Sequence, residues 1–595
     1  MCYIKKFIAT SAFFAVCLAS MGQQPVRGTV KDTDGNPLIG VTISADGKPV
    51  SVTDLDGNFT LPSASPSTKL EVSYVGYQSQ SIVLGKSKTL NVVLQEQDKT
   101  LNEVVVVGYG TMKKSDLTGS VASIGNEKLN EKGTPSVLEG LQGSVPGVSI
   151  TKTSGRAAGS LSIEIRGKNS ISGSQNPLYV VDGIICSDID FLNPQDIERV
   201  DVLKDASSTA IYGSRATAGV VMITTKSGMT VGKSMERPVI SYDGYYGISK
   251  VARMPDFMDA NEFYQYRFMK FLNVAGSEKF DGQPVMTNDD LARCLLQDGV
   301  TGRYRMKELL ASGKTYDWPD MVLQDGMQQN HYLAVSGSTE RIHYHMGLGY
   351  TGEKGTFVGD NLKKVNIKGS LDGNISKAVT VGFNFNLTRS NHDYASNDAV
   401  SNAFHVNPFM QPYDADGNVN LKPGSKEVLG TDLYQFSSQI SPLIYMRDQS
   451  SNTLGWTALT NVYLQLRLLK GLSFKTTFSP TFTYMRYGYY QGTEAGESQN
   501  TARRTSDQGY TWTWDNILTY DRMFGKDHHL NAMALVSASY ANAESEKLYY
   551  NKVLEGTYWW AVGTTNQGYD YGNSGSDFSE SSLLSYALRA NYTCI

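Results

Sequence analysis

The sequence has few cysteines, few histidines and no excess of charge of either sign. Only 5 cysteines and 7 histidines occur in 595 residues. Cys2 and Cys17 lie in the first 22 residues, and the other three cysteines are odd in number and far apart, so no disulfide framework is predicted. The 54 basic and 58 acidic residues give a formal net charge of -4, which provides no electrostatic argument for binding to nucleic acid.

Long apolar runs are also missing beyond the N-terminus. The run from Phe7 to Ala19 follows two lysines and precedes small residues, a pattern typical of a secretory signal peptide over residues 1–22. Lipid attachment at Cys17 is the alternative, but the residues before it form a poor lipobox. Past this leader no run is long enough for a membrane helix, so a role in the membrane would require β-strands.

Residues 25–96 alternate short apolar segments with turn sequences such as DTDGNP, ADGKP and DLDGN. Turns at this frequency predict a small β-sandwich. The paired aspartates of DTDGNP and DLDGN could indicate calcium sites. Neither of these two turns has the glutamate twelve positions along that an EF-hand loop needs, so turn formation is favoured. The module resembles the carboxypeptidase regulatory-like, transthyretin-like domains of secreted Bacteroidetes proteins. It holds no histidine and no zinc-peptidase motif.

The stretch LNEVVVVGYGTMKK, residues 101–114, follows this module. Four consecutive β-branched valines, 104–107, stiffen the backbone between Glu103 and two glycines, which predicts a very short strand. No partner strand is expected next to it in the sequence, and an unpaired extended segment can add to the sheet edge of another protein. An ordinary buried strand is the alternative interpretation.

Residues 115–228 indicate a mixed α/β domain. A helix is predicted with Thr134 as N-cap and Pro135 as its first residue, ending at Pro146–Gly147. Asn193–Pro194 predicts a short turn, and Asp205 is expected to cap a further helix. Strands are predicted at 148–151, 161–167, 177–183, 197–204 and 219–226.

From about residue 238 onward the chain is rich in segments that alternate apolar and polar side chains. In residues 378–388, AVTVGFNFNLT, valine, phenylalanine and leucine share one face, and threonine, glycine and asparagine share the other. About ten such strands are predicted, with short and long connections in alternation, as the two ends of a membrane barrel require. Tyrosines and tryptophans at 484, 487, 489, 490, 512, 514, 559 and 560 are expected to form girdles at the membrane interfaces.

Several segments in a fixed order carry a specific family resemblance. NEVVVVGYGTMKKSDLTGSV is followed by VPGVSI, IRG, NPLYVVDGI and LNPQDIERVDVLKDASSTAIYGSRATAGVVMITTKSG. Over about residues 25–250 the sequence resembles the SusC/RagA family of TonB-dependent outer-membrane transporters. The fold class implied is mainly β, with a transthyretin-like β-sandwich, an α/β plug domain at 115–228 and an incomplete transmembrane antiparallel β-barrel at 238–595.

The resemblance also implies partners and a location. The protein is expected in the outer membrane as a multi-pass barrel, in contact with its lipid, with periplasmic N-terminal domains. The implied partners are the C-terminal domain of TonB, within the TonB–ExbB–ExbD complex, and a SusD-like surface lipoprotein. The implied substrates are oligosaccharides or peptides, and no cofactor is implied. The TonB box would consist of Asn102, Glu103, Val104, Val105, Val106, Val107 and Gly108.

Charged side chains of the plug form the second candidate site. The simpler interpretation is that they form structural salt bridges between the plug and the barrel wall. The alternative is that they form a latch that breaks when the plug is pulled. In the barrel region His343 and His345 share a strand face, but no third metal ligand is evident, and a polar lumen explains them as well. The charged residues are Arg166, Asp182, Asp196, Glu198, Arg199, Asp201 and Lys204.

Ten strands are too few to enclose a folded plug, because plugged transporters need about twenty-two. The sequence is therefore expected to be the N-terminal portion of a transporter. A binding or adhesion protein without transport and a truncated, non-functional remnant are the alternatives. An enzyme is not expected, because no nucleophile elbow, phosphate loop or metal cluster is found.

Overall fold

The structure is a computed structural model of the chain. The chain forms two compact units, residues 1–105 with 111–118 and residues 106–110 with 119–595. The predicted signal peptide, 1–22, lies outside the described residues. The structure describes residues 26–594 except 34, 46–47, 62–67, 75–76, 85–88, 96–103, 108–109, 114–119, 160, 169–174, 229–236, 267–278, 281–282, 285–307, 426–427, 429–438, 498, 526–527, 557 and 562–567.

The first unit contains the predicted β-sandwich. One sheet has the order β4-β1-β7 and the other the order β3-β2-β5-β6. Val30, Val41 and Ile43 are fully buried between them, as alternating strands with one apolar face require. The turn aspartates accept backbone N–H groups; Asp54, for example, accepts from Asn58 N at 2.8 Å. The strands are β1 (Val26–Lys31), β2 (Thr42–Ala45), β3 (Lys48–Val52), β4 (Asn58–Leu61), β5 (Lys69–Ser73), β6 (Gln80–Val83) and β7 (Thr89–Val93).

The valine segment is a strand, but it is not unpaired. Strand β8 (Val104–Val107) forms a two-stranded sheet with β9 (Gly110–Lys113). The expectation that no neighbouring segment would pair with it is therefore wrong. Two residues are enough to connect the strands of a hairpin. The pairing uses backbone hydrogen bonds, so the partner strand need not show the apolar pattern by which strands are predicted from a sequence. Asn102, Glu103 and Gly108 lie outside the described residues.

The plug, residues 121–226, is built on a five-stranded sheet of order β10-β15-β16-β13-β14, with a separate hairpin β11-β12. Val200, Val202 and Val221 are fully buried in its core. Its strands are β10 (Val121–Gly125), β11 (Val148–Lys152), β12 (Leu161–Ile165), β13 (Leu178–Val181), β14 (Ile184–Cys186), β15 (Ile197–Leu203) and β16 (Val220–Thr225). Its helices are α2 (Asn126–Asn130), α3 (Val137–Leu141), η3 (Pro194–Asp196), α4 (Ala206–Thr209) and η4 (Ala210–Ala216).

Short-range sequence signals set most local features of the plug. Asp182 and Gly183 both have positive φ angles, 49° and 88°, in the tight turn from β13 to β14. Asp205 caps its helix as predicted, accepting from Ser208 N, and the short turn predicted at Asn193–Pro194 is the 3-10 helix η3, in which Asn193 accepts from Gln195 N. The helix predicted from Pro135 to Pro146 is wrong in its bounds, because α3 starts after Ser136 and ends at Leu141.

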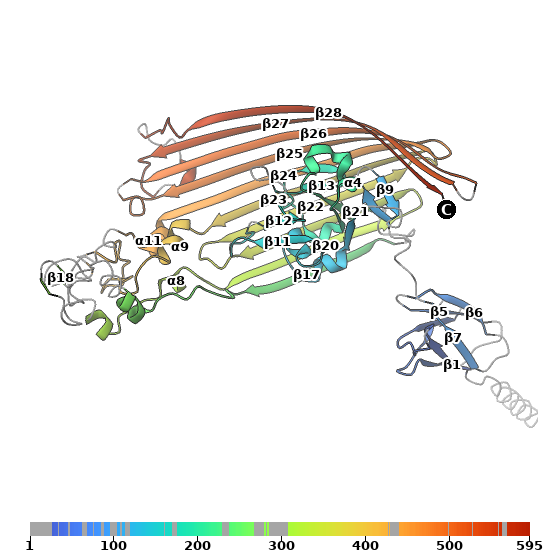
Figure 1. The fold of residues 1–595 in the computed structure, drawn as a ribbon, viewed down its shortest axis with the longest axis horizontal. Helices are drawn as coiled ribbons and strands as arrows, with labels where there is room; N and C mark the ends of the chain where they lie inside the picture. The colour runs from blue at the N-terminus through green and yellow to red at the C-terminus, as the bar shows by residue number, and fades with distance from the viewer. Residues whose placement is uncertain are drawn as a thin grey trace, which may run out of the picture. The chain divides into compact units, whose positions relative to one another are not determined.

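The largest element is a ten-stranded antiparallel sheet, called the wall here. Its strands follow one another in chain order from β17 to β28, and the plug lies against one face of it (Figure 1). This confirms the ten predicted strands. They are β17 (Val239–Ser249), β20 (Gly326–Ser338), β21 (Ile342–Lys354), β22 (Asn361–Asn374), β23 (Val379–Tyr394), β24 (Gln449–Leu469), β25 (Leu472–Gln491), β26 (Thr501–Phe524), β27 (His528–Asn551) and β28 (Gly575–Cys594).

The connections of the wall alternate in length, as predicted. At one end the strands are joined by residues 339–341, 375–378, 470–471 and 525–527. At the other end the connections are 250–325, 355–360, 395–448, 492–500 and 552–574. The longer ones include β18 (Lys279–Phe280), β19 (Gln283–Pro284), α8 (Trp318–Met321), α9 (Asn397–Ala403), α11 (Pro442–Asp448) and η5 (Trp559–Ala561). One end of the wall therefore carries nearly all the irregular structure.

The two faces of the wall have opposite chemistry. On the outer face apolar side chains are exposed, among them Phe383 and Trp514 at 41% and 49%. On the inner face, next to the plug, polar side chains are buried, among them Asn366, Lys368 and Thr388. Because a soluble sheet would bury its apolar face, this reversal favours a lipid-facing exterior. None of the helices in the described residues has the length and apolarity that a membrane crossing needs.

Candidate functional site: a polar interface and a cavity between plug and wall

The plug loop after β14 is held to the wall through its backbone carbonyls. Lys364 Nζ donates to the carbonyl oxygens of Asp190 and Leu192, at 2.9 and 3.1 Å. The Phe191 carbonyl accepts from Asn366 Nδ2 and from Thr388 Oγ1, at 2.5 and 2.8 Å. Lys364 and Asn366 lie two positions apart on β22, so both point to the inner face. A run of three carbonyls thus provides acceptors for three wall side chains.

A buried hydrogen-bond network joins Asp196 to two strands of the wall. Tyr332 Oη donates to Asp196 Oδ1 at 2.6 Å and lies 3.1 Å from His345 Nε2. His345 Nδ1 in turn lies 2.8 Å from Ser336 Oγ. Burial raises the pKa of Asp196 to about 6, although the Tyr332 hydrogen bond and nearby lysines oppose that rise. Burying a carboxyl group at this position therefore lowers the stability of the fold unless its hydrogen-bond partners remain in place.

A buried ion pair also links the plug to the wall. Lys368 Nζ lies 3.4 Å from Asp182 Oδ2, and only 2% of the Lys368 side chain is exposed. Within the plug, Thr225 fixes the Asp182 carboxylate by donating its backbone N–H at 2.9 Å and its hydroxyl at 2.5 Å. The turn at Asp182–Gly183 therefore positions a carboxylate that the wall neutralises.

The hairpin loop between β11 and β12 makes a further set of polar contacts with the wall. Ala157 N donates to Asp360 Oδ2 at 2.6 Å, and Ala158 N donates to Glu353 Oε2 at 2.8 Å. Asp360 is fully buried, and its other carboxylate oxygen lies 2.9 Å from His392 Nε2. Two wall carboxylates thus accept from consecutive backbone amides of this loop.

The charged residues predicted from the sequence have different positions. Asp182 and Asp196 contact the wall, as described above. Arg199 pairs with Asp201 at 2.9 Å, and Lys204 donates to the Pro146 carbonyl, both within the plug. Arg166 follows β12 with a positive φ of 57°, and Glu198 is half-buried in β15.

The wall partners were not identified by sequence reasoning. Lys364, Asn366 and Lys368 follow one another at every second position of the segment LKKVNIKGS. This row of polar side chains on one face of a strand was the sequence signal by which the wall partners could have been found. Its function could not be inferred, because the facing plug groups are mostly backbone carbonyls, which no sequence pattern distinguishes.

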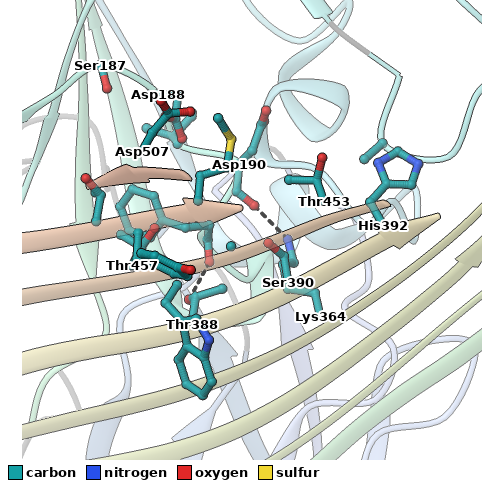
Figure 2. Close-up of a pocket in the computed structure, with 18 of the residues that line it drawn as sticks. Ser187, Asp188, Asp190, Lys364, Thr388, Ser390, His392, Thr453, Thr457 and Asp507 are labelled. Atoms are coloured by element: carbon teal, nitrogen blue, oxygen red, sulfur yellow. Dashed lines mark hydrogen bonds between the residues drawn. The ribbon is translucent and has the colours of Figure 1, made fainter. Parts of the chain in front are cut away.

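A cavity of about 680 Å³ lies between the plug and the inner face of the wall (Figure 2). Ser187, Asp188 and Asp190 of the plug line it on one side. On the wall side it is lined by hydroxyl groups, including Thr388, Ser390, Thr453 and Thr457, and by Asp507. Burial raises the pKa of Asp190, and the neighbouring charge of Asp188 adds to this effect. Oxygen-bearing side chains thus line the cavity on both sides, together with apolar residues such as Leu161 and Phe191.

Some of the aromatic residues predicted to form membrane girdles face inward instead. Arg503 lies over the rings of Tyr487 and Tyr549, at 5.3 and 4.8 Å from their centroids, and Tyr489 is its cross-strand partner. Arg503 shares the face of Asp507, four residues along the same strand, and Asp507 lines the cavity. For Tyr487 and Tyr489 the girdle prediction is thus wrong, because clustering near strand ends does not fix which face a residue occupies.

The two histidines considered as a metal pair are used in hydrogen bonds. His343 Nδ1 lies 2.7 Å from Ser338 Oγ, and His345 belongs to the Asp196 network. In the part of the chain that the structure describes, no group of three or more His, Cys, Asp or Glu side chains is arranged to hold a metal ion.

Comparison with known families agrees with this architecture. Residues 113–220 match the family described as TonB-dependent Receptor Plug Domain, and residues 26–106 match the CarboxypepD_reg-like domain. A TonB-dependent receptor of Formosa agariphila is 30% identical over 97% of this chain and 55% of its own length. The TonB-dependent receptor SusC of Bacteroides thetaiotaomicron is 34% identical over 58% of this chain and 31% of its own length.

A solved structure has the same fold. The RagAB peptide importer in the open-open state superposes with a TM-score of 0.67 over 83% of this chain and 55% of that chain, at 23% sequence identity. The α/β plug against a polar inner wall is thus the architecture of a TonB-dependent receptor. Together with the CarboxypepD_reg-like domain and the SusC relative, it identifies this sequence as that of a SusC/RagA-type TonB-dependent receptor. The chain spans about half the length of the curated relatives it matches.

Proposed function

We propose that this sequence belongs to a protein that imports nutrients across the outer membrane with energy supplied through TonB. The observation that carries the proposal is the chemistry of the interface between plug and wall. Hydrogen bonds and a buried ion pair hold the plug there, as at Lys364, Asn366 and Lys368. Water can replace such contacts, whereas the apolar contacts of the interface, such as Ile211 against Ile517 and Leu535, would expose apolar surface on separation. An interface of this kind suits a plug that is displaced and then returns.

In this proposal the segment Asn102–Gly108 is the TonB box. The C-terminal domain of TonB pairs with it by adding a strand, and backbone hydrogen bonds provide a grip that transmits force. Its valines form the extended strand β8, which supports the assignment. Because β8 is paired with β9, TonB would have to displace β9 or use the other edge of β8.

A proline substitution tests this assignment. Val105→Pro removes a backbone donor and is expected to abolish uptake while substrate binding stays unchanged. Val105→Ala keeps the N–H group and is the matched control, with uptake near that of the parent. Uptake and binding are measured in the same cells with a labelled substrate mixture. Parental uptake by Val105→Pro would refute the TonB-box assignment.

The proposed organisation follows from the same assignment. Residues 25–96 form the sandwich, 101–114 the TonB-box segment and linker, 115–228 the plug and 238–595 part of the outer-membrane barrel, with the N-terminal domains in the periplasm. The proposed partner is a SusD-like lipoprotein, and the substrates are oligosaccharides or peptides. SusC among the relatives and a peptide importer among the structures of the same fold support this pair of alternatives. The named relatives are receptors, which supports a protein without catalysis.

Adhesion without transport is the second candidate function, and the long connections at one end of the wall favour it as display loops. Deletion of residues 102–108 separates the two. Surface binding would survive the deletion under both functions, but uptake would be lost only if the protein is a transporter.

A further inference from the structure

The apolar band on the outer face of the wall ends at one level on neighbouring strands, and basic residues follow it. On β22, β23 and β25 the last apolar or aromatic residues of this band are Val365, Leu387 and Tyr484. The next outward-facing position, two residues closer to the long connections, holds a basic residue on all three strands. These basic residues are Lys363, Arg389 and Arg486.

The height of the band fixes this level in the membrane. On β25 the outward-facing positions of the band run from Phe474 to Tyr484, which is about 33 Å along the strand. At a strand tilt of about 40° this is about 25 Å along the barrel axis, the usual height of the apolar band of an outer-membrane barrel. Arg486 therefore lies just beyond the hydrocarbon layer. Because the long connections of such barrels are extracellular, Arg486 is at the level of the headgroups of the outer leaflet.

The strand register gathers three arginines at this level, called the arginine patch here: Arg389, Arg486 and Arg504. Arg504 is opposite Gly488 on β25 and is thus diagonal to Arg486, at about 7–8 Å. Arg389 is opposite Trp456 on β24, the strand between β23 and β25, which places it about 12 Å from Arg486. Long side chains can approach a common ligand across these separations.

Two tryptophans position the arginine patch. The guanidinium carbon of Arg389 lies 5.8 Å from the ring centroid of Trp456, and that of Arg486 lies 3.9 Å from the ring centroid of Trp559. Tryptophan is enriched where a membrane protein passes from hydrocarbon to headgroups, so these rings mark the same level independently of the band height. Arg486 also donates to Asn452 Oδ1 at 2.7 Å, and its Nε has no hydrogen-bond partner.

Carboxylates are scarce around the arginine patch. Among the described residues, none of its three arginines forms an ion pair. On β21–β26 the three outward-facing rows through Tyr484, Arg486 and Gly488 hold one acidic side chain, Asp393, whose Oδ1 accepts from Asn452 Nδ2 at 2.7 Å. A bound anion would relieve the repulsion between the arginines. The basic side chains of the same rows are Lys354, Lys363, Arg389, Arg486 and Arg504.

We propose that the arginine patch binds the phosphate group of a glycolipid headgroup in the outer leaflet, with the chemistry of lipid A. A guanidinium group holds a phosphate through two parallel hydrogen bonds, and basic residues beside a membrane retain anionic lipids. Phe478 and Phe482, exposed on the same strand face as Arg486, would contact the acyl chains. The inference goes beyond import, because it rests on the proposed outer-membrane barrel and not on TonB or on a transported substrate.

Two lipids that differ only in phosphate provide the test. Monophosphoryl lipid A is compared with the same lipid after enzymatic removal of its phosphate. Binding to the protein, purified from outer membranes and freed of lipid in a non-ionic detergent, is measured by native mass spectrometry over a lipid titration. The phosphorylated lipid is expected to bind at least about tenfold more tightly, because more than one basic side chain acts on its phosphate.

Substitutions localise the effect. Arg389→Gln with Arg504→Gln is expected to weaken binding of the phosphorylated lipid by roughly tenfold to thirtyfold, at about fivefold for each lost charge. Neither arginine makes a hydrogen bond to another described residue, so the fold should be preserved. Arg504→Gln alone, with a loss of about fivefold, is the second variant if the pair disturbs folding.

The matched control is Arg522→Gln, which removes the same charge from the same face of the same strand. Arg522 is exposed near the end of β26 that has the short connection, away from the arginine patch. Binding of the phosphorylated lipid should therefore be unchanged in this variant.

Three results would overturn the proposal. The first is equal binding of the two lipids, including no binding of either. The second is a phosphate preference that persists without Arg389 and Arg504, and the third is an equal loss in Arg522→Gln. Because the measurement involves neither TonB nor transport, normal uptake by Val105→Pro would refute the TonB-box assignment and leave the lipid site standing.

Discussion

Individual buried polar residues at the interface between plug and wall depend on single partners. Asp196 is 1% exposed, and its Oδ1 accepts from Tyr332 Oη. A buried carboxyl group that loses its donor pays the desolvation cost without compensation. Conservative substitutions at this interface should therefore cause large losses in the free energy of unfolding.

Tyr332→Phe keeps the ring and removes the hydroxyl donor. We expect the free energy of unfolding of the second unit to fall by about 1–3 kcal/mol, because Asp196 is left without this hydrogen bond. Chemical denaturation followed by tryptophan fluorescence measures the change. Tyr350→Phe is the control, since that ring stacks on His331 at 6.4 Å and is not part of the Asp196 network. A double-mutant cycle with Asp196→Asn should show coupling between the two sites, and strict additivity would contradict this account.

The raised pKa of Asp196 predicts a pH dependence with a definite sign. Its pKa is about 6 in the folded chain, against about 3.9 when unfolded. Between these values the folded state binds more protons, so the free energy of unfolding decreases as pH rises from about 4 to 6 and is constant above. Asp196→Asn should remove this contribution, which is at most about 3 kcal/mol. Denaturation midpoints of parent and variant at pH 4.5 and 7.5 measure it, and equal pH slopes would show that Asp196 is not responsible.

At the scale of elements, strand β21 approaches the plug so closely that glycine is required. A Cβ atom added to Gly349 would overlap Asn193 Nδ2 of the plug, and one added to Gly347 would overlap Asp196 Oδ1 of the plug as well as Tyr332 Oη of the neighbouring wall strand. Asn193 is the N-cap of η3. The strand therefore contacts a side chain that can rotate away only by giving up its hydrogen bond from Gln195 N.

Gly349→Ala should move the plug away from β21. We expect a loss of stability of about 1–3 kcal/mol from overpacking and faster hydrogen exchange in residues 190–203. Mass spectrometry of exchanged peptides measures both the place and the extent of the change. Gly373→Ala in β22 is the matched control, because the nearest atom to its added Cβ is 3.6 Å away, an ordinary contact. Equal exchange in the two variants would argue against close packing at Gly349.

At the scale of the whole molecule, the sandwich has a core of its own. Val30, Ile43 and Leu70 are fully buried within it, and it belongs to a separate compact unit. Units with separate cores unfold separately unless a large apolar interface joins them.

Ile43→Ala tests this independence. It should destabilise the sandwich by about 2–5 kcal/mol, because it leaves a cavity in a closed core. Calorimetry should show one thermal transition shifted down and the transition of the second unit unchanged. Leu55→Ala, at a position that is 77% exposed, is the control. A shift of both transitions together would indicate that the units unfold cooperatively.

Local patterns predicted much of the fold. Alternation of apolar and polar residues located the ten wall strands, and turn sequences located the sandwich. Asp205 marked its helix start correctly and Asn193–Pro194 its short turn, because a capping side chain acts on a backbone group two or three residues away. The same reasoning misplaced the start of α3 at Pro135, because the N-cap is Ser136, which makes no capping hydrogen bond through its side chain. It also missed β9, whose pairing with β8 depends on backbone geometry.

The sequence by itself therefore determined the wall strands, the alternation of their two faces and the family resemblance, since each depends on spacing along one chain. The tertiary structure decided which groups meet. It alone brought Asp196 to Tyr332, 136 positions away, and made Asp507 of the wall and Asp188 of the plug line one cavity. The physical reason is that these contacts join a side chain to a distant backbone or carboxyl group. Such pairs have no periodicity along the chain, and only the folded arrangement of plug and wall specifies them.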